Sequence, residues 1–149
     1  MTKPATELPT DTASVSHDLK SSGALGFGRV WRALGYSRKG IASAWRDEAA
    51  FRQELALFVV LAPLTLWLRL PTLDTVVLLA LMGLVLTIEL LNSGLEALVD
   101  KTTPELHRLA GKAKDCGSAA VLMSMLTFGG AWLSLAGPAL FGAIRSAMN

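Results

Sequence analysis

A stripe of polar side chains lies in the second half of the most hydrophobic part of this chain. The polar residues occupy positions i, i+3, i+4, i+7 and i+11 of a segment otherwise rich in leucine: Glu89, Asn92, Ser93, Glu96 and Asp100. At about 100° per residue, this spacing places them on one face of a helix. An ionisable side chain at the centre of a bilayer costs on the order of 2.5 to 3.5 kcal/mol, so this acidic stripe favours a functional site over simple packing.

The composition is typical of a small membrane protein. Of the 149 residues, 52% are hydrophobic and only 17% are charged, and the mean hydropathy is positive. The net charge of +2 is too small to indicate a nucleic-acid partner. The single cysteine, Cys116, excludes an intrachain disulfide, and the two histidines, His17 and His107, do not form a zinc-binding cluster.

The N-terminal residues differ from the rest of the chain. Residues 1–23 are rich in Thr, Ser, Pro and charged residues, and they lack the apolar run of a signal peptide. Such a composition predicts a disordered extension. Residues 24–149 are then expected to form a single membrane-embedded domain.

The spacing of apolar residues predicts an all-α fold. Residues 27–45 repeat apolar side chains at i, i+3, i+4 and i+7 with basic residues opposite, which is typical of a helix lying in the headgroup region. Residues 76–98 and 119–144 are apolar enough to cross a membrane. The apolar residues 55–70 are short for a span but suffice if the helix starts near Ala49 with its polar end in the interface. The polar residues 105–114 are expected to be helical and precede the third span. The prediction is an N-terminal amphipathic surface helix followed by three transmembrane helices.

Positive charges predict the orientation in the membrane. Eight Lys and Arg residues precede Leu55, one lies in the first loop, four lie between the second and third spans, and one follows the third. Because Lys and Arg concentrate on the cytoplasmic side, the N-terminus and the second loop are expected in the cytoplasm and the C-terminus outside. The acidic stripe is therefore expected within reach of cytoplasmic cofactors.

Several residues near this depth have the chemistry of phosphate transfer. Mg²⁺ takes oxygen ligands and commonly bridges one or two carboxylates to phosphate, and Glu48 and Glu96 could supply these carboxylates. Nearby Lys and Arg could neutralise the transferring phosphate. Glu89 lies two turns deeper, where it would suit a general base for a hydroxyl at the membrane surface. No GxxxxGK[ST] motif is present, which argues against a P-loop enzyme.

Each of these features also has a purely structural interpretation. The stripe could pair with Lys or Arg of a neighbouring helix and hold an assembly together. The charges of residues 47–54 are typical of a solvated helix end, and Lys112 and Lys114 of topology determinants. Tyr36 fits an interfacial anchor, and His107 a solvated loop. The residues alone indicate a small three-span membrane protein with an acidic site, and they do not select a substrate.

Three motifs resemble a known family. They are residues 48–54 (EAAFRQE), 89–100 (ELLNSGLEALVD) and 111–120 (GKAKDCGSAA), and they occur in order on the predicted elements. Together they closely resemble the prokaryotic integral-membrane diacylglycerol kinases, over roughly residues 26–135. The resemblance implies an inner-membrane homotrimer that transfers the γ-phosphate of ATP to diacylglycerol and forms phosphatidic acid, with active sites between subunits.

The resemblance also implies roles for individual residues. Glu48 and Glu96 would hold Mg²⁺ with ATP, Glu89 would be the catalytic base, and Asn92 would orient that region. The residues implied to meet the nucleotide are Arg29, Tyr36, Glu105, Leu106, His107, Lys114 and Asp115, with Leu106 contributing only backbone. The residues implied to border the lipid are Arg29, Ala50, Phe51, Arg52, Gln53, Glu54, Trp67, Leu68, Arg69, Leu70, Glu89 and Ser118.

Two alternative functions remain open at this point. Undecaprenol kinases share the acidic motifs and the fold, although the intact run from Phe51 to Glu54 favours diacylglycerol. A non-enzymatic ion-conducting or transport protein could instead line a permeation path with the stripe. Magnesium-dependent ATP consumption that requires a lipid alcohol distinguishes the kinases from the transport protein.

Overall fold

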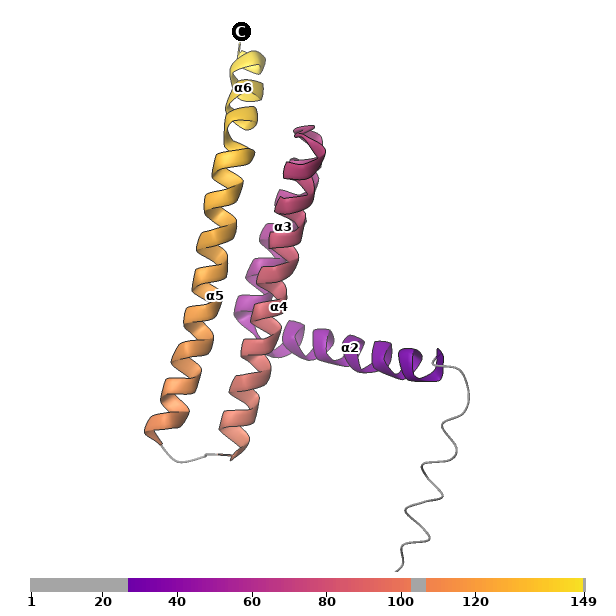
Figure 1. The fold of residues 1–149 in the computed structure, drawn as a ribbon, viewed down its shortest axis with the longest axis vertical. Helices are drawn as coiled ribbons and strands as arrows, with labels where there is room; N and C mark the ends of the chain where they lie inside the picture. Colours follow the sequence, from indigo (N-terminus) through magenta and orange to yellow (C-terminus); the bar gives the residue numbers. More distant parts are fainter. Residues whose placement is uncertain (1–26, 103–106, 149) are drawn as a thin grey trace, which may run out of the picture. The chain divides into compact units, whose positions relative to one another are not determined.

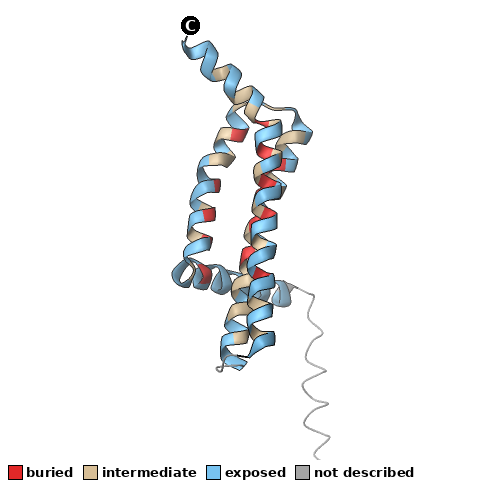
Figure 2. Cartoon of the chain, turned by 90° about the vertical axis from the view of Figure 1, so that its left-hand side faces the viewer, coloured by how far each residue is buried: buried red, intermediate tan, exposed pale blue. Residues whose placement is uncertain are grey.

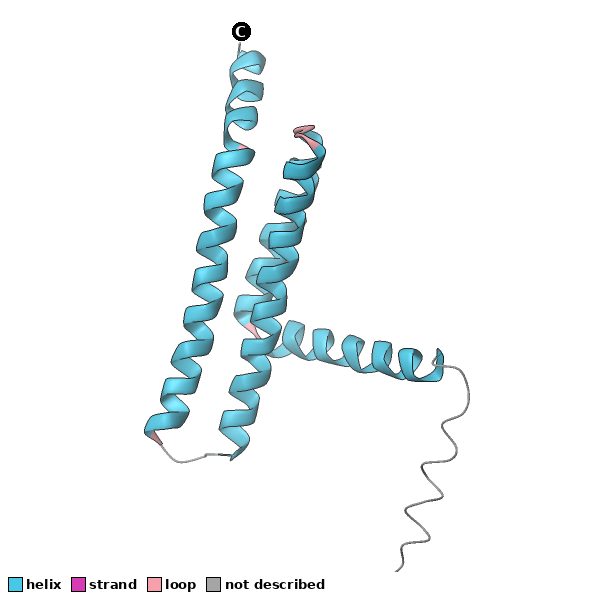
Figure 3. Cartoon of the chain, viewed as in Figure 1, coloured by secondary structure: helices cyan, strands magenta, loops and turns pink. Residues whose placement is uncertain are grey.

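The computed structural model describes residues 27–102 and 107–148, and these residues form helices without any strand (Figures 1 and 3). The helices are α2 (Phe27–Asp47), α3 (Ala49–Trp67), α4 (Thr72–Thr102), α5 (Arg108–Leu135) and α6 (Gly137–Met148). Three of them, α3, α4 and α5, are long and apolar enough to cross a membrane. The predicted all-α fold with three membrane-length helices is therefore confirmed. The predicted disordered extension, residues 1–23, lies outside the described residues.

Helix α2 is shared between two compact units, one ending at Arg38 and the other beginning at Lys39. In the first unit, apolar side chains such as Trp31 and Leu34 are exposed, as expected for an amphipathic helix without its membrane. In the second unit, Arg52 closes the end of α2, because its Nη1 donates to the carbonyl oxygens of Trp45 and Arg46, at 3.0 Å each. A cation at the C-terminal carbonyls of a helix also complements the helix dipole.

Helices α3 and α4 form an antiparallel pair joined by the short turn at residues 68–71 (Figure 1). Arg69 adopts a positive φ of 51°, which the tight reversal requires at that position. Beyond the turn, Thr75 N–H donates to the carbonyl of Pro71 at 3.0 Å, so Pro71 directly precedes α4 and accepts its first hydrogen bond. Helix α4 then runs for 31 residues, about 46 Å at 1.5 Å per residue. It extends beyond the predicted span, residues 76–98, at both ends.

The core lies where α3, α4 and α5 meet, away from the α4–α5 connection (Figure 2). Phe58 of α3 and Phe128 of α5 pack edge to face, with ring centroids 5.0 Å apart. Trp132 Nε1 donates to Thr65 Oγ1 at 3.1 Å, and Thr65 is fully buried. The buried residues of this cluster are Phe58, Leu78, Met82, Val85, Phe128, Trp132 and Ala136.

The prediction of the third span was wrong in its boundaries. A single span over residues 119–144 was expected, whereas α5 begins at Arg108 and ends at Leu135, and α6 forms a separate helix. At the early end, His107 Nδ1 accepts a hydrogen bond from Leu109 N–H at 3.2 Å and caps the helix, so the polar segment is its first part. At the late end, Pro138 has no N–H to continue the helical ladder, and α6 turns away from α5 (Figure 2).

Candidate functional site

The acidic stripe passes from the buried interior of the helices to their exposed end. Glu89 is 2% exposed and follows the buried Val85 by one turn of α4. Asn92, Ser93 and Glu96 are half-buried, and Asp100 is exposed. The spacing that predicted a single helical face therefore also produces a graded burial, because successive turns approach the end of the α4–α5 pair.

Three buried oxygen atoms near the stripe have no hydrogen-bond partner among the described residues. They are Glu89 Oε2 and Asn92 Oδ1 on α4, and Glu54 Oε2 on α3. Glu54 is 6% exposed and Glu89 is 2% exposed, so both carboxylates lie away from bulk solvent. A buried oxygen without a partner costs about 1 to 3 kcal/mol, and more when the group is charged. These atoms are therefore available to a ligand or to another chain.

The carboxylates of α3 and α4 are close enough to act on one another electrostatically. Glu48 and Glu96 both repel a negative charge on Glu89, and Glu89 in turn repels one on Glu54. Glu48 lies between α2 and α3 in an extended conformation, and its carboxylate makes no capping hydrogen bond. The folded chain thus gathers four acidic groups, from α3, from α4 and from the junction before α3, within electrostatic reach of one another.

Hydrogen bonds within α4 fix part of the stripe. Asn92 Nδ2 donates to Glu96 Oε1 at 3.1 Å, and Ser93 Oγ donates to the carbonyl of Glu89 at 3.0 Å. The Asn92 amide therefore orients one carboxylate oxygen of Glu96 and leaves the other oxygen for a different partner. The orienting role that the resemblance implies for Asn92 stays a prediction.

A salt bridge joins α4 to α5 at the exposed end of the stripe. Lys114 Nζ lies 3.0 Å from Asp100 Oδ1 and 3.3 Å from Oδ2. It is the one salt bridge within the described residues. The structural interpretation of the stripe, pairing with a basic residue of a neighbouring helix, thus holds within this chain for Asp100. Glu89 and Glu96 form no such pair among the residues that the structure describes.

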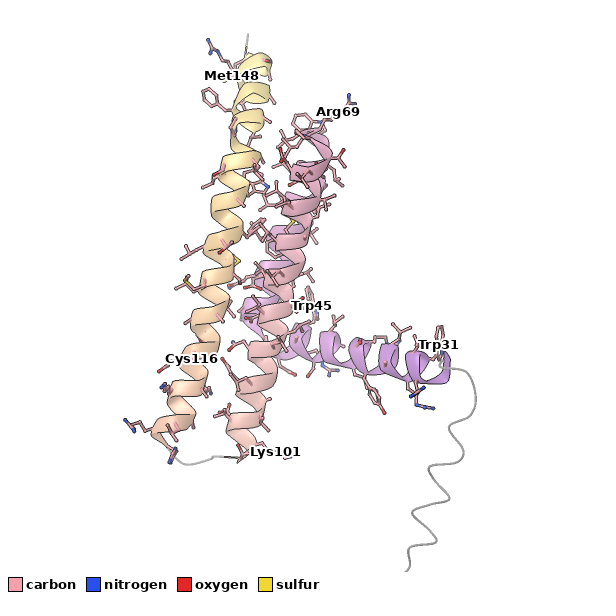
Figure 4. The ribbon with its side chains drawn as sticks, viewed as in Figure 1. Trp31, Trp45, Arg69, Lys101, Cys116 and Met148 are labelled. Atoms are coloured by element: carbon pink, nitrogen blue, oxygen red, sulfur yellow. The ribbon has the colours of Figure 1, made fainter. Side chains whose placement is uncertain are left out.

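Some of the residues predicted for the site have structural contacts of their own. Arg52 closes α2, and His107 caps α5, as described above. Phe51 is 3% exposed, so its ring is not open to lipid within this chain. Ala50, Gln53, Asp115 and Ser118 are exposed. Cys116, beside Asp115, is exposed on α5 near its beginning (Figure 4).

One predicted lipid-bordering segment, residues 67–70, lies far from the acidic stripe. The segment from Trp67 to Leu70 begins at the last residue of α3, a helix about 28 Å long if its 19 residues each rise 1.5 Å. Figure 4 places Arg69 at the opposite end of α4 from Lys101. Trp67 lies 13 residues beyond Glu54, about 20 Å along α3 at 1.5 Å per residue, which is more than half of a hydrocarbon layer about 30 Å thick. Arg29 and Tyr36 lie in the first compact unit, and Glu105 and Leu106 lie outside the described residues.

The oxygen groups suit a hard cation that also binds phosphate. No three His, Cys, Asp or Glu side chains among the described residues lie close enough together to hold a metal by themselves. Mg²⁺ needs no such cage, because it keeps several waters and uses one or two carboxylates together with phosphate oxygens. Glu48 and the second oxygen of Glu96 match this requirement.

Sequence reasoning missed one residue of the site, Gly117 on α5. It is buried, and its Cα faces the amide of Asn92 and the side chain of Leu95. A glycine inside an otherwise regular helical pattern is a known signal of close backbone approach, but the pattern alone does not say what approaches.

Membrane-length helices with buried carboxylates between them define an integral-membrane protein with an acidic site at one end. The family model for prokaryotic diacylglycerol kinase matches residues 35–136. The diacylglycerol kinase of Escherichia coli (strain K12) is 45% identical to this chain over 101 residues, which cover 68% of this chain and 83% of that protein. The diacylglycerol kinase of Pseudomonas aeruginosa is 40% identical over 113 residues, covering 76% and 92%. This chain belongs to the prokaryotic diacylglycerol kinase family, which confirms the resemblance, and Arg29 and α6 lie outside the matched residues.

Proposed function

We propose that this protein is a lipid kinase that transfers the γ-phosphate of ATP to the hydroxyl of diacylglycerol, forming phosphatidic acid and ADP. The observation that carries the proposal is Glu89, a carboxylate 2% exposed within a membrane-length helix and with one oxygen unpaired. Family membership and the names of the relatives support the choice of reaction.

The chemical step needs a base, and it needs the attacking and leaving oxygens to lie in line on opposite sides of the γ-phosphorus. Glu89 accepts the proton of the lipid hydroxyl, the hydroxyl oxygen attacks the γ-phosphorus, and the bond from that phosphorus to the β–γ bridging oxygen breaks. Glu89 suits this role because its unpaired Oε2 is free to accept a proton at the depth where a lipid hydroxyl lies. Asn92 keeps Glu96 in a fixed orientation next to the reacting groups.

The nucleotide is proposed to bind at the exposed end of the stripe. Bound Mg²⁺ would neutralise phosphate charge, and Glu48 and Glu96 would hold it. Lys114 would leave Asp100, or share it, to contact phosphate. By motif position, the further nucleotide contacts are Arg29, Tyr36, Glu105, Leu106, His107 and Asp115.

The lipid is proposed to approach along the first turns of α3. Ala50 and Gln53 are exposed there, and the unpaired oxygen of Glu54 lies one turn beyond Ala50. Ser118 on α5 completes the border. Trp67 to Leu70 would meet acyl chains of the opposite leaflet. The protein would lie in the inner membrane with its N-terminus in the cytoplasm, because most of its Lys and Arg residues precede the first span or lie between the second and third spans, and such residues concentrate on the cytoplasmic side.

A homotrimer is proposed because one chain leaves its site incomplete. Leu91 and Leu98 flank the stripe and are 69% and 58% exposed, and the oxygens of Glu54 and Glu89 lack partners. Co-expressing inactive Glu89→Gln subunits with inactive Glu48→Gln subunits should restore part of the activity if the two residues complete a site from different chains. Absence of rescue, with mixed trimers confirmed by two tags, would place the whole site within one subunit.

Phosphate transfer in mixed micelles tests the reaction itself. Purified protein is incubated with labelled ATP, Mg²⁺ and either diacylglycerol or undecaprenol, and the labelled lipid is counted. We expect Mg²⁺-dependent transfer that is faster to diacylglycerol. Faster transfer to undecaprenol would assign the protein to that branch. If folded protein labels neither lipid but carries ions across vesicle membranes, the kinase proposal is wrong.

A further inference from the structure

Gly117 makes the closest approach of α5 to the acidic stripe of α4. A Cβ built on Gly117 would overlap Asn92 Oδ1, and it would lie 3.2 Å from Asn92 Cγ and 3.3 Å from Leu95 Cδ2. Gly130, on the same helix, is exposed and has no atom within 4 Å of such a Cβ. The space normally taken by a side chain at position 117 is therefore occupied by the amide oxygen of Asn92.

The position of Asn92 is held from two sides. Its Nδ2 donates to Glu96 Oε1 at 3.1 Å, and its Oδ1 lies against Gly117, buried and without a hydrogen-bond partner. Asparagine has only two side-chain torsions, so the amide cannot move away from α5 without also moving its nitrogen away from Glu96. A methyl group at position 117 would therefore act on Glu96 through Asn92.

We propose that Gly117 is a positioning residue of the active site. Without a side chain, it lets the Asn92 amide lie between α4 and α5 and hold the Glu96 carboxylate where that group binds Mg²⁺ and ATP. The metal-binding part of this inference rests on the function proposed above. The contact between Gly117 and Asn92 rests on the geometry alone.

A simpler role for Gly117 would be close helix packing. Small residues at helix interfaces let membrane helices approach, and a methyl group would then cost stability without a specific effect on the metal. The two roles differ in what they predict when Asn92 is shortened. A positioning role disappears with the Asn92 side chain, because the methyl group then has no amide to displace.

The first experiment compares Gly117→Ala with the matched control Gly130→Ala in the full-length trimer in detergent. Groups that orient a metal ligand typically change metal affinity by about 10- to 100-fold when they are disturbed. We therefore expect Gly117→Ala to raise the Mg²⁺ concentration for half-maximal activity about 10-fold or more, with an unchanged KM for diacylglycerol. Gly130→Ala should leave both unchanged. An unchanged Mg²⁺ requirement in Gly117→Ala would overturn the proposal.

The second experiment is a double-mutant cycle that does not depend on activity. Thermal unfolding is measured for Gly117→Ala with Asn92 intact and with Asn92→Ala. We expect Gly117→Ala to lower the Tm with Asn92 intact, and to lower it much less with Asn92→Ala, where only the contact with Leu95 remains. Equal effects in both backgrounds would overturn the contact. If the wild-type protein phosphorylates no lipid, the proposed function fails, and this cycle still decides whether Gly117 acts through the side chain of Asn92.

Discussion

The two ends of the α3–α5 helices bury polar groups in opposite ways. At the apolar end, Thr65 is fully buried and Trp132 is 9% exposed, and the two are hydrogen-bonded to each other. At the acidic end, Glu54 and Glu89 are buried to a similar degree, and each keeps an oxygen without a partner. Since the polar side chains at the two ends are buried to a similar degree, the ends differ in whether these side chains have hydrogen-bond partners. A satisfied pair holds helices together, whereas unsatisfied carboxylates keep a site ready for a ligand.

The two ends also differ in the size of the residues through which the helices pack. At the apolar end, α3 and α5 meet through the large rings of Phe58 and Phe128. At the acidic end, α4 and α5 meet through Gly117, which leaves room for an amide. Substitutions at the two ends are therefore expected to separate stability from activity.

The largest effect is expected at Glu89. Glu89→Gln keeps the size of the side chain and removes its ability to accept the hydroxyl proton, and general base catalysis typically contributes 10²- to 10⁴-fold. We expect turnover to fall by about that factor while ATP affinity and folding are retained. Lipid phosphorylation and ATP binding are measured in parallel. A Gln variant within a few-fold of wild type would remove Glu89 from this role.

The next effect is expected in the metal requirement. Glu96→Gln preserves the Oε1 that accepts from Asn92 but removes the negative charge proposed to hold Mg²⁺. We expect a higher Mg²⁺ concentration for half-maximal activity and weaker ATP binding, with an unchanged Tm. An unchanged Mg²⁺ titration together with a lower Tm would instead favour a structural role at this end of the molecule.

At the apolar end, a substitution should cost stability and spare activity. Thr65→Val leaves Trp132 Nε1 buried without an acceptor. Hydrogen bonds between membrane helices contribute about 0.6 kcal/mol on average and up to about 1.7, so the free energy of unfolding should fall by roughly 1 kcal/mol. The control is Thr127→Val, because Thr127 is exposed and bonds only to Met123 of its own helix. A fall in turnover below the unfolding temperature would contradict the separation of the two ends.

The smallest effect is expected at Asp100. Its salt bridge to Lys114 is solvent-exposed, and salt screens such pairs. Asp100→Asn should therefore leave the Tm unchanged and alter only the KM for ATP, by releasing Lys114. The difference from wild type should shrink as ionic strength rises. Loss of activity as large as that of Glu89→Gln would show that Asp100 acts directly on the reacting groups.

Much of the fold could be predicted from the sequence because it depends on local patterns. Runs of apolar residues predicted three membrane-length helices, and these are confirmed. The third was placed wrongly, because a charge-free run was taken as one span although Pro138 interrupts it and the polar residues from Arg108 onward continue the helix. A helix does not end where hydrophobicity ends, since backbone hydrogen bonding continues beyond the membrane.

The candidate site was predictable in its residue types and less so in its contacts. The stripe on α4 and its graded burial follow from helical spacing. The cap that Arg52 places on α2 was not predictable, because it depends on the turn between two helices. Nor was the burial of Phe51, which depends on the neighbouring elements.

By itself, the sequence determined the helices, the acidic face of α4 and the family. These are properties of residues close together along the chain, where 3.6 residues per turn relates spacing to direction. Only the tertiary structure decided which buried polar groups find partners. Thr65 and Trp132 are 67 residues apart and form a hydrogen bond. Glu54 and Glu89 are also far apart in the sequence, and each keeps an oxygen without a hydrogen-bond partner. Whether a buried polar group finds a partner depends on differences of about an ångström in the spacing between helices. That spacing is set by the residues at the contact, such as Gly117, which has no side chain, and no local sequence pattern contains it.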